Sequence, residues 1–511
     1  LILCFFAIAC VHAEPEGGWL RDGGPELLSH ADVVELAADS PSEGLLRKLD
    51  VLLATPIVSN AAARTSHGPR RPVVGGVGPV IRVALWNLER GYNLDQIALA
   101  FEQPSELLKL ARSGAHSEGA ARLQAEHLSG ADVIIINEAD LGVSRSDYAD
   151  VTAHLATRLR MNYAFGAEFV EVDPILLGLE QPKGDASSVR DWNAEHKIDR
   201  ERFRGLHGNA VLSRYPITAA RLLRLPDCYD WYGKEKQSIA HLEKGRRWTA
   251  RRLFEERISR EIRRGGRIAL IVELAVPEAP GGRVTVVSTH LENKCRPACR
   301  QDQMDAVMAS LKEVPHAVIV GGDLNTTGTD AAPTSIRREI TRRASSLKFW
   351  LGMAVRYGSP VTLPQVGLLP ANHFKNYLDP SAFHLPLVLP NREDGIFTKV
   401  QRFRFADGGR FDFSGSPGRT RDRRSGTLGN SNQRHFKGFQ PTFTFERTLG
   451  GIVGRYKLDW FFVKPAADGA LAPHYPATMN ELNEVSGSRI SDHPPLTVDL
   501  PLQMNGSGAM P

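Results

Sequence analysis

The chain has 511 residues, of which 42% are hydrophobic and 24% are charged, a composition typical of a globular protein with a sizeable core. Its 63 basic and 58 acidic side chains give a formal net charge of only +5. This balance excludes a heavily cationic nucleic-acid coat protein but permits a local basic groove, and the length permits one large domain with insertions or two domains.

Residues 1–13 have the features of an export signal. They begin with an apolar run from Leu1 to Ala9 and end in the small residue Ala13. This pattern predicts an N-terminally truncated signal peptide cleaved after Ala13, and hence a periplasmic or secreted protein. A lipid anchor at Cys10 and a short buried helix are the alternatives. No run approaches the about 20 consecutive apolar residues of a spanning helix, so no transmembrane span is expected.

Residues 14–78 are rich in Pro, Gly, Ala and Ser, and we interpret them as an N-terminal extension or linker. Beyond them, short apolar runs alternate with segments of helical periodicity at 148–159 and 304–311. This alternation predicts a mixed α/β domain over residues 79–500. The predicted strands are residues 80–86, 132–136, 209–212, 267–274, 284–288, 317–320 and 458–463.

Two long irregular segments, 171–206 and 328–445, interrupt this pattern and are interpreted as insertions. The second carries many Arg residues between 402 and 434, which could line a phosphate-binding groove with neighbouring Phe side chains stacked on bases. The alternative is a solvated loop whose Phe side chains pack on the core. Interleaved Arg and Glu residues over 246–264 predict a salt-bridged exposed helix. Residues 501–511 are expected to form a flexible tail. The Phe residues concerned are Phe403, Phe405, Phe411 and Phe413.

Three cysteines follow the predicted signal peptide. Cys295 and Cys299 lie in one short loop, where an oxidising compartment could close a local disulfide between them. Two thiolates without nearby His or Cys partners are too few for a zinc site. Cys228 has no evident partner and is expected to be buried.

Polar residues recur where the apolar strands end. Taken singly, an Asp such as Asp323 often serves only a turn, and a His such as His290 is often a core residue. Their recurrence at successive strands favours one shared site, because strand ends meet at one edge of a sheet. The segments are Trp86-Asn87, Asn137-Glu138, His207 to Ser213, Ser288-Thr289-His290-Leu291-Glu292, Gly321-Gly322-Asp323-Leu324-Asn325, Leu458-Asp459-Trp460 and Ser491-Asp492-His493-Pro494.

This ordered series resembles the endonuclease/exonuclease/phosphatase superfamily, which includes deoxyribonuclease I, exonuclease III, neutral sphingomyelinases and inositol polyphosphate 5-phosphatases. The resemblance runs from about Val80 to Leu500, apart from the two insertions. It implies an α/β fold, a four-layer α-β-β-α sandwich of two mixed β-sheets with flanking helices. It also implies a Mg²⁺-dependent phosphoric ester hydrolase, in which Mn²⁺ could replace Mg²⁺.

The resemblance further implies roles for individual residues. Glu138 matches the principal metal carboxylate, supported by Asn87 and Asp492. Asp323 matches the residue that orients or deprotonates the attacking water. Asn325 and His493 are predicted to contact the phosphate, and His290 to donate a hydrogen bond to the developing oxyanion. Asp459 is predicted to orient His493, and Asn209 to order the substrate pocket.

The substrate stays open at this stage. A phosphodiesterase or nuclease is the leading interpretation. The expected partner is a phosphate ester, with nucleic acid among the candidates, bound by a monomer. A lipid or small-molecule phosphoesterase is the alternative, because the nuclease branches usually have Gln-Glu where this chain has Asn137-Glu138. A non-catalytic binding protein on the same scaffold is a further alternative.

Overall fold

A computed structural model describes most of the chain. The described residues are 18–64, 68–109, 118–179, 198–236, 261–326, 384–385, 389–390, 393–412, 442–444, 455–466, 471–485 and 487–502.

The larger of two main sheets has nine strands in the order β1-β5-β6-β4-β3-β18-β17, with β2 paired to β3 and β8 paired to β5. β3 and β4 run parallel and the other neighbours are antiparallel, so the sheet is mixed. The strands are β1 (Ile57–Ser59), β2 (Val73–Val74), β3 (Gly78–Arg90), β4 (Val133–Leu141), β5 (Asn162–Glu171), β6 (Leu206–Ser213), β8 (Arg263–Gly265), β17 (His474–Thr478) and β18 (Leu496–Pro501).

The smaller sheet has five strands in the order β16-β11-β10-β9-β7, of which β10 and β11 are parallel. Two short ribbons, β12-β13 and β14-β15, lie outside both sheets. The strands are β7 (Ile217–Arg224), β9 (Ile268–Ala275), β10 (Arg283–His290), β11 (Ala317–Asp323), β12 (His384–Leu385), β13 (Leu389–Pro390), β14 (Phe443–Thr444), β15 (Arg455–Tyr456) and β16 (Asp459–Lys464).

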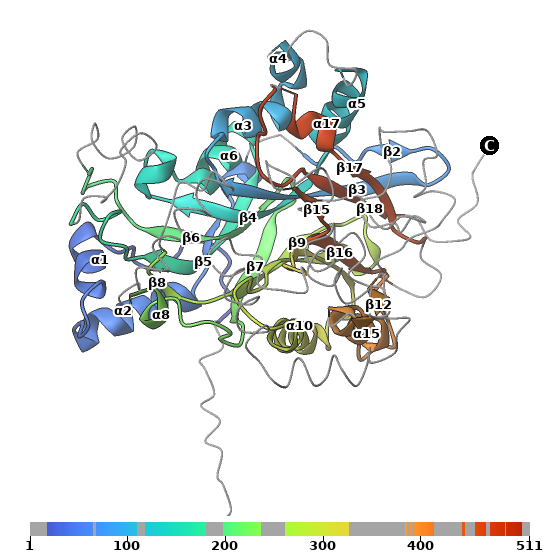
Figure 1. Ribbon diagram of the computed structural model, residues 1–511. Helices are drawn as coiled ribbons and strands as arrows, with labels where there is room; N and C mark the ends of the chain where they lie inside the picture. The colour runs from blue at the N-terminus through green and yellow to red at the C-terminus, as the bar shows by residue number, and fades with distance from the viewer. Residues whose placement is uncertain are drawn as a thin grey trace, which may run out of the picture.

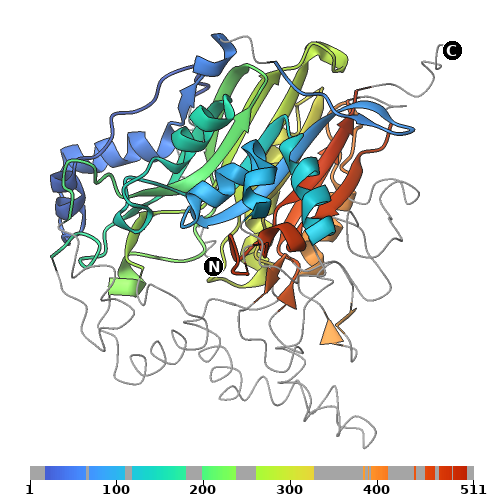
Figure 2. The same ribbon diagram turned by 90° about the horizontal axis from the view of Figure 1, so that it is seen from above.

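Helices cover the outer faces of both sheets. In Figures 1 and 2, α3 to α6 and α17 lie over the larger sheet, whereas α10 and α15 lie under the smaller one. The helices are α1 (His30–Leu36), α2 (Glu43–Ala54), α3 (Leu94–Glu102), α4 (Pro104–Lys109), α5 (Glu118–Ser129), α6 (Val151–Leu159), α8 (Gly233–Lys236), α10 (Pro297–Leu311), α15 (Asp394–Arg402) and α17 (Asn480–Asn483), with 3-10 turns at Ala61–Arg64, Ser144–Ser146 and Pro280–Gly282.

The core lies in three apolar layers, which explains this order of elements. The middle layer joins the facing sides of the two sheets, with residues such as Leu85 and Ile135 from the larger and Val272 and Ile319 from the smaller. Continuous apolar runs therefore form strands that are buried on both faces. The predicted four-layer sandwich of two mixed sheets with flanking helices is confirmed.

The N-terminal segment differs from the predicted extension. Leu49 and Leu52 of α2 are buried in the same outer core as Phe165 of the larger sheet. β1 pairs with β5 and forms the edge of that sheet, so residues 18–64 belong to the fold instead of leading to it. An amphipathic pattern near residues 32–53 indicates the helical part of this segment, whereas its Pro- and Gly-rich composition hid the edge strand.

The described part of the second insertion packs on the core. Phe405 and Phe411 are buried, Phe403 is partly buried, and Phe411 packs beside Phe462 of β16. Phe405 and Phe411 are therefore not available to stack on bases, whereas Phe403 keeps part of its surface exposed. Residues 413–441, including Phe413, lie outside the described residues. Within the basic stretch 246–264, only 261–264 are described, and they lead into β8 and not into a helix.

The disulfide joins Cys228 to Cys299, with the two Cα atoms 5.9 Å apart, so the predicted Cys295–Cys299 bond is wrong. Cys299 lies in the first turns of α10, and the segment after β7 brings Cys228 beside it. Cys295 is reduced, and its Sγ donates to the carbonyl oxygen of Glu292 at 3.3 Å. A pairing across 71 residues depends on tertiary structure, which cysteine spacing does not reveal.

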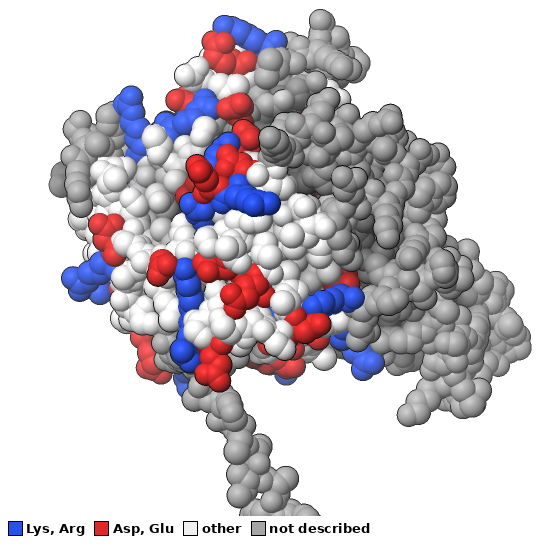
Figure 3. Space-filling view, turned by 90° about the vertical axis from the view of Figure 1, so that its left-hand side faces the viewer, with Lys and Arg blue, Asp and Glu red and all other residues white. Residues whose placement is uncertain are grey.

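Charges of both signs intermingle on the face shown in Figure 3. Ion pairs occur among the described surface residues: Lys48 pairs with Glu26 at 2.7 Å and with Asp32 at 3.1 Å. Among the described residues, no helix combines the length and apolar character needed to cross a membrane.

Candidate active site

Strand register brings three of the predicted site residues together at the end of the smaller sheet. His290 is the register partner of Asp323 between β10 and β11, and Asp459 is the partner of Asp323 between β11 and β16. Gly322 allows this close alignment, because a Cβ atom there would collide with the backbone of Thr289. A two-glycine strand end thus delivers a buried carboxylate between a histidine and a second carboxylate.

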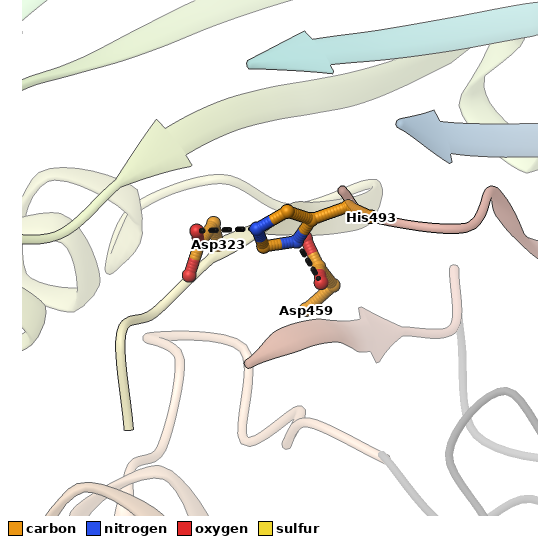
Figure 4. Close-up of side chains that lie close together, drawn as sticks. All are labelled: Asp323, Asp459 and His493. Carbon is orange, nitrogen blue, oxygen red and sulfur yellow. Dashed lines mark hydrogen bonds and ion pairs between the residues drawn. The ribbon is translucent and has the colours of Figure 1, made fainter. Parts of the chain in front are cut away.

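His493 completes this group from the other sheet. It lies just before β18, and its Nδ1 is 2.7 Å from Oδ2 of Asp459 (Figure 4). The indole of Trp86 donates to the carbonyl oxygen of His493 at 2.8 Å, and the backbone N–H of His493 donates to Oγ of Ser491 at 3.2 Å. Both the ring and its backbone are therefore held. Burial opposes the charged ring, but Asp459 and Asp492 raise the pKa of His493 well above its ordinary value.

Asp323 lies at the centre of the site. Its Oδ2 is 3.7 Å from Nε2 of His290, 3.7 Å from Nε2 of His493 and 3.4 Å from the amide nitrogen of Asn87. Burial, followed by repulsion from Asp459, raises the pKa of Asp323 to about 7. A carboxylate whose pKa lies near neutrality is suited to accept a proton from water.

The larger sheet contributes a second, acidic group through two irregularities. The register between β3 and β4 shifts after Asn87, and the register between β4 and β6 shifts after Ile136. At these bulges Glu89 and Glu138 adopt left-handed backbone conformations, with φ of 47° and 57°. Bulges re-aim side chains, and here both glutamates fall beside Asp492.

Glu89, Glu138 and Asp492 are half-buried, and they repel one another. Burial and repulsion from Asp492 raise the pKa of Glu89 to about 8. Burial, with a contribution from Glu138, likewise raises the pKa of Asp492. For Glu138, burial is outweighed by nearby cations, Arg90 foremost, so its pKa is lowered. This cluster of carboxylates would be stabilised by a cation.

The donor atoms of this cluster fit a hard divalent metal. Asn87, Glu138 and Asp492, predicted as the metal ligands, offer amide and carboxylate oxygens, which Mg²⁺ and Mn²⁺ prefer. Asp323, Asp459 and His493 also each place one possible ligand atom within 4.8 Å of the others. Of these two sets, only Asp323, Asp459 and His493 form such a close group of possible ligand atoms among the described residues.

His290 has different neighbours from His493. Nη1 of Arg267 lies 2.9 Å from Nδ1 of His290 and 2.9 Å from Oε2 of Glu168. All three side chains are buried. Burial, followed by the charge of Arg267, lowers the pKa of His290 well below its ordinary value.

Asn209 lies one layer behind the centre. Its amide nitrogen donates to Glu168 at 3.1 Å, and its carbonyl oxygen accepts from Asn137 at 2.9 Å. Asn137 in turn accepts the backbone N–H of Asp323 at 2.9 Å. Asn209 therefore orders the site through other residues, and its predicted contact with substrate stays a prediction.

Asn325 differs from its predicted geometry. Asn325 lies two residues after Asp323, and in a continuing strand both side chains would point to the same face. Instead, β11 ends at Asp323 and Asn325 has a left-handed φ of 49°. Its backbone N–H donates to Oδ1 of Asp323 at 2.8 Å, and its side-chain amide donates to the carbonyl oxygen of Leu291 at 2.9 Å. Asn325 thus closes a turn that holds both Asp323 and the chain after His290.

The structure therefore gathers the predicted residues in two groups. His290, Asp323, Asp459 and His493 form the buried group, with the turn of Asn325 behind them. The predicted metal ligands Asn87, Glu138 and Asp492 adjoin it.

No role was predicted for Glu89, Glu168 or Arg267. Glu89 lies two residues after Asn87, close to the end of a predicted strand, but the strand-end pattern assigned it no function. Glu168 lies within a strand and Arg267 directly before one, and neither belongs to a polar strand-end motif.

A family model described as the endonuclease/exonuclease/phosphatase family matches residues 84–493. A search of curated protein sequences gives no match. Similar solved structures include an endonuclease/exonuclease/phosphatase from Beutenbergia cavernae (15% identity, 84% of this chain and 73% of that chain, TM-score 0.35), the human Nocturnin catalytic domain (16%, 85% and 98%, 0.33) and the 3'-5' exonuclease of Neisseria meningitidis (10%, 83% and 100%, 0.35).

Proposed function

The chain belongs to the endonuclease/exonuclease/phosphatase family, and from this premise we propose that it is a metal-dependent phosphodiesterase. It would use an activated water to cleave a phosphodiester, and nucleic acid is the leading candidate substrate. The observation that carries the proposal is the position of Asp323. A buried carboxylate with a pKa of about 7 lies within 3.7 Å of two histidine nitrogens and beside a cluster of acidic oxygen donors.

Asp323 would orient the attacking water and accept its proton. Its two oxygens differ in their surroundings, because Oδ1 accepts the N–H of Asn325 while Oδ2 faces the two histidines and Asn87. This leaves Oδ2 as the atom that would hold the proton.

His493 would stabilise negative charge on the phosphate. Asp459 accepts from Nδ1 of His493, which orients the ring and favours its charged form, so Nε2 would donate to a phosphate oxygen. His290, whose Nε2 lies 3.7 Å from Oδ2 of Asp323, would donate to a second phosphate oxygen. The contribution of Asn325 would come through the turn that it closes at Asp323, and that of Asn209 through Asn137.

Asn87, Glu138 and Asp492 would hold Mg²⁺, with Mn²⁺ as a substitute, and Glu89 lies close enough to add charge to this set. When bound, the metal would neutralise negative charge on the phosphate. We further propose that the protein acts as a monomer outside the cytoplasm, and the Cys228–Cys299 disulfide is consistent with an oxidising compartment.

The decisive experiment measures nicking of supercoiled plasmid and hydrolysis of bis(p-nitrophenyl) phosphate, both in Mg²⁺. Wild type is compared with Asp323→Ala and with Asp132→Asn, a buried carboxylate that instead accepts backbone N–H groups of Arg70 and Arg71. Loss of a general base typically lowers the rate about 10²- to 10⁴-fold. We expect that loss for Asp323→Ala only.

Each result has a distinct meaning. Nicking by wild type and Asp132→Asn but not by Asp323→Ala supports a nuclease. Hydrolysis of the small diester without nicking would move the search to lipid or small-molecule esters. A folded, Mg²⁺-binding wild type inactive on both substrates would contradict the proposal and favour a binding protein.

A further inference from the structure

A buried network of hydrogen bonds behind Asp323 begins at the guanidinium of Arg267. An arginine side chain can only donate hydrogen bonds, and it remains protonated in proteins. Nη1 of Arg267 is 2.9 Å from both Oε2 of Glu168 and Nδ1 of His290. The two hydrogens on this one nitrogen account for both contacts.

The direction of the bond to His290 follows from this chemistry. Because Arg267 donates, Nδ1 of His290 must accept and cannot carry a hydrogen. The proton of the neutral ring then lies on Nε2, which is 3.7 Å from Oδ2 of Asp323. A doubly protonated ring would place two donors against each other at 2.9 Å.

Arg267 also separates His290 from a carboxylate. Oε2 of Glu168 is 3.8 Å from Nδ1 of His290, so this oxygen would be the nearest acceptor for a hydrogen on Nδ1 if the guanidinium were absent. In that case Glu168 would favour the opposite tautomer or the cationic ring, as Asp459 does for His493 at 2.7 Å.

The second branch of the network leads to the same aspartate. Glu168 accepts from Asn209, Asn209 accepts from Asn137, and Asn137 accepts from the backbone N–H of Asp323. Each amide is oriented by the one before it, beginning with a carboxylate that is itself paired with Arg267. One arginine therefore sets the hydrogen-bond direction both at His290 and behind Asp323.

We propose that Arg267 is a positioning residue that holds His290 as a neutral ring with its proton on Nε2, so that His290 serves the site as a hydrogen-bond donor and not as a proton donor. The catalytic half of this statement rests on the proposed function. The tautomer is a property of the resting protein and can be tested without substrate.

The test is ¹⁵N NMR of protein labelled at histidine, in which protonated and unprotonated ring nitrogens have well-separated shifts. His290→Gln identifies the signals of His290 by their loss. The expected wild-type spectrum has an unprotonated Nδ1 and a protonated Nε2 at His290. A proton on Nδ1, alone or with one on Nε2, would overturn the proposal.

Three variants then test the role of Arg267. Arg267→Met should move the proton of His290 toward Nδ1 and lower kcat on bis(p-nitrophenyl) phosphate about 10- to 100-fold with little change in KM. Arg267→Lys keeps a cationic donor and should restore part of the wild-type tautomer and part of the wild-type kcat. Arg221→Met alters an arginine that donates to the carbonyl oxygen of Ser310, and it should change neither the tautomer of His290 nor kcat.

A folded Arg267→Met protein with the wild-type tautomer would overturn the positioning role. If Arg267→Met does not fold, the wild-type spectrum still tests the tautomer of His290, and Arg267→Lys still tests the role of Arg267. Absence of hydrolysis by wild type with the expected tautomer would contradict the proposed function while leaving the assignment of His290 intact.

Discussion

The two sheets contribute unlike halves to the candidate site. The smaller sheet supplies Asp323, Asp459 and His290, which are buried and linked through regular strand register. The larger sheet supplies Glu89 and Glu138, which are half-buried, lie at bulges and repel neighbouring carboxylates. Regular strand register thus builds a preorganised group around Asp323. The bulges instead bring carboxylates together that a bound cation would stabilise.

His493 and Asp492 connect the two halves. These neighbours precede β18 of the larger sheet, yet His493 pairs with Asp459 of the smaller sheet while Asp492 adds its charge to Glu89. Breaking either half should therefore have separable effects on chemistry and on metal binding.

The largest effect is expected in the buried half. Asp459→Asn removes the carboxylate that accepts from Nδ1 of His493, so the ring should lose its orientation and its positive charge. We expect kcat/KM on bis(p-nitrophenyl) phosphate to fall about 10²- to 10⁴-fold with unchanged Mg²⁺ affinity. His316→Gln, a half-buried histidine bonded to Thr285, is the control. Equal loss in the control would mean that the effect is structural.

The acidic half is tested by Glu138→Gln. Loss of a carboxylate from the predicted metal set should weaken Mg²⁺ binding by at least about tenfold in calorimetry. The buried half should keep its structure, so excess Mg²⁺ should restore part of the activity. Unchanged affinity in Glu138→Gln would instead favour a metal at Asp323, Asp459 and His493.

The acidic half should also make stability depend on pH. The pKa of Glu89 rises from 4.5 to about 8 on folding, so between these values the folded chain binds more protons than the unfolded chain. The free energy of unfolding without metal should therefore fall as pH rises from 4.5 to about 8. Mg²⁺ should raise Tm more at about pH 8 than at pH 4.5.

Thermal unfolding with and without Mg²⁺ measures this dependence. Glu89→Gln removes the titrating group and should flatten the pH dependence of Tm in the absence of metal. A metal-induced rise in Tm that is equal at both pH values would contradict the proposed cation site.

The smallest effect on activity is expected from the disulfide. Cys228→Ser opens a bond that spans 71 residues and should lower the free energy of unfolding by about 2–4 kcal/mol. Activity should change little, because neither cysteine lies in the two groups of site residues. Cys295→Ser, which leaves the bond intact, is the matched control in urea unfolding. A larger loss of stability in Cys295→Ser would contradict the observed pairing.

Much of the site was predictable, because strand ends converge. Asp323 and His493 follow from polar residues placed after or near apolar runs, and the register of β10, β11 and β16 confirms the juxtaposition of His290, Asp323 and Asp459. The four-layer fold was predictable from the same runs together with the family resemblance.

Features that depend on backbone irregularity or tertiary pairing were not predictable. Asn325 follows a strand yet turns left-handed, since its N–H caps Asp323. Arg267 approaches His290 only because β9 lies beside β10. The Cys228–Cys299 bond likewise needs the fold to bring distant segments together.

The place of β18 has a consequence for synthesis. This late strand lies between β3 and β17, so the larger sheet cannot close until residue 501 has left the ribosome. Asp492 and His493 are made just before this strand, whereas His290 and Asp323 are made much earlier. The candidate site therefore cannot be complete in the nascent protein until Asp492 and His493 have been made, and its long-range pairings favour slow folding.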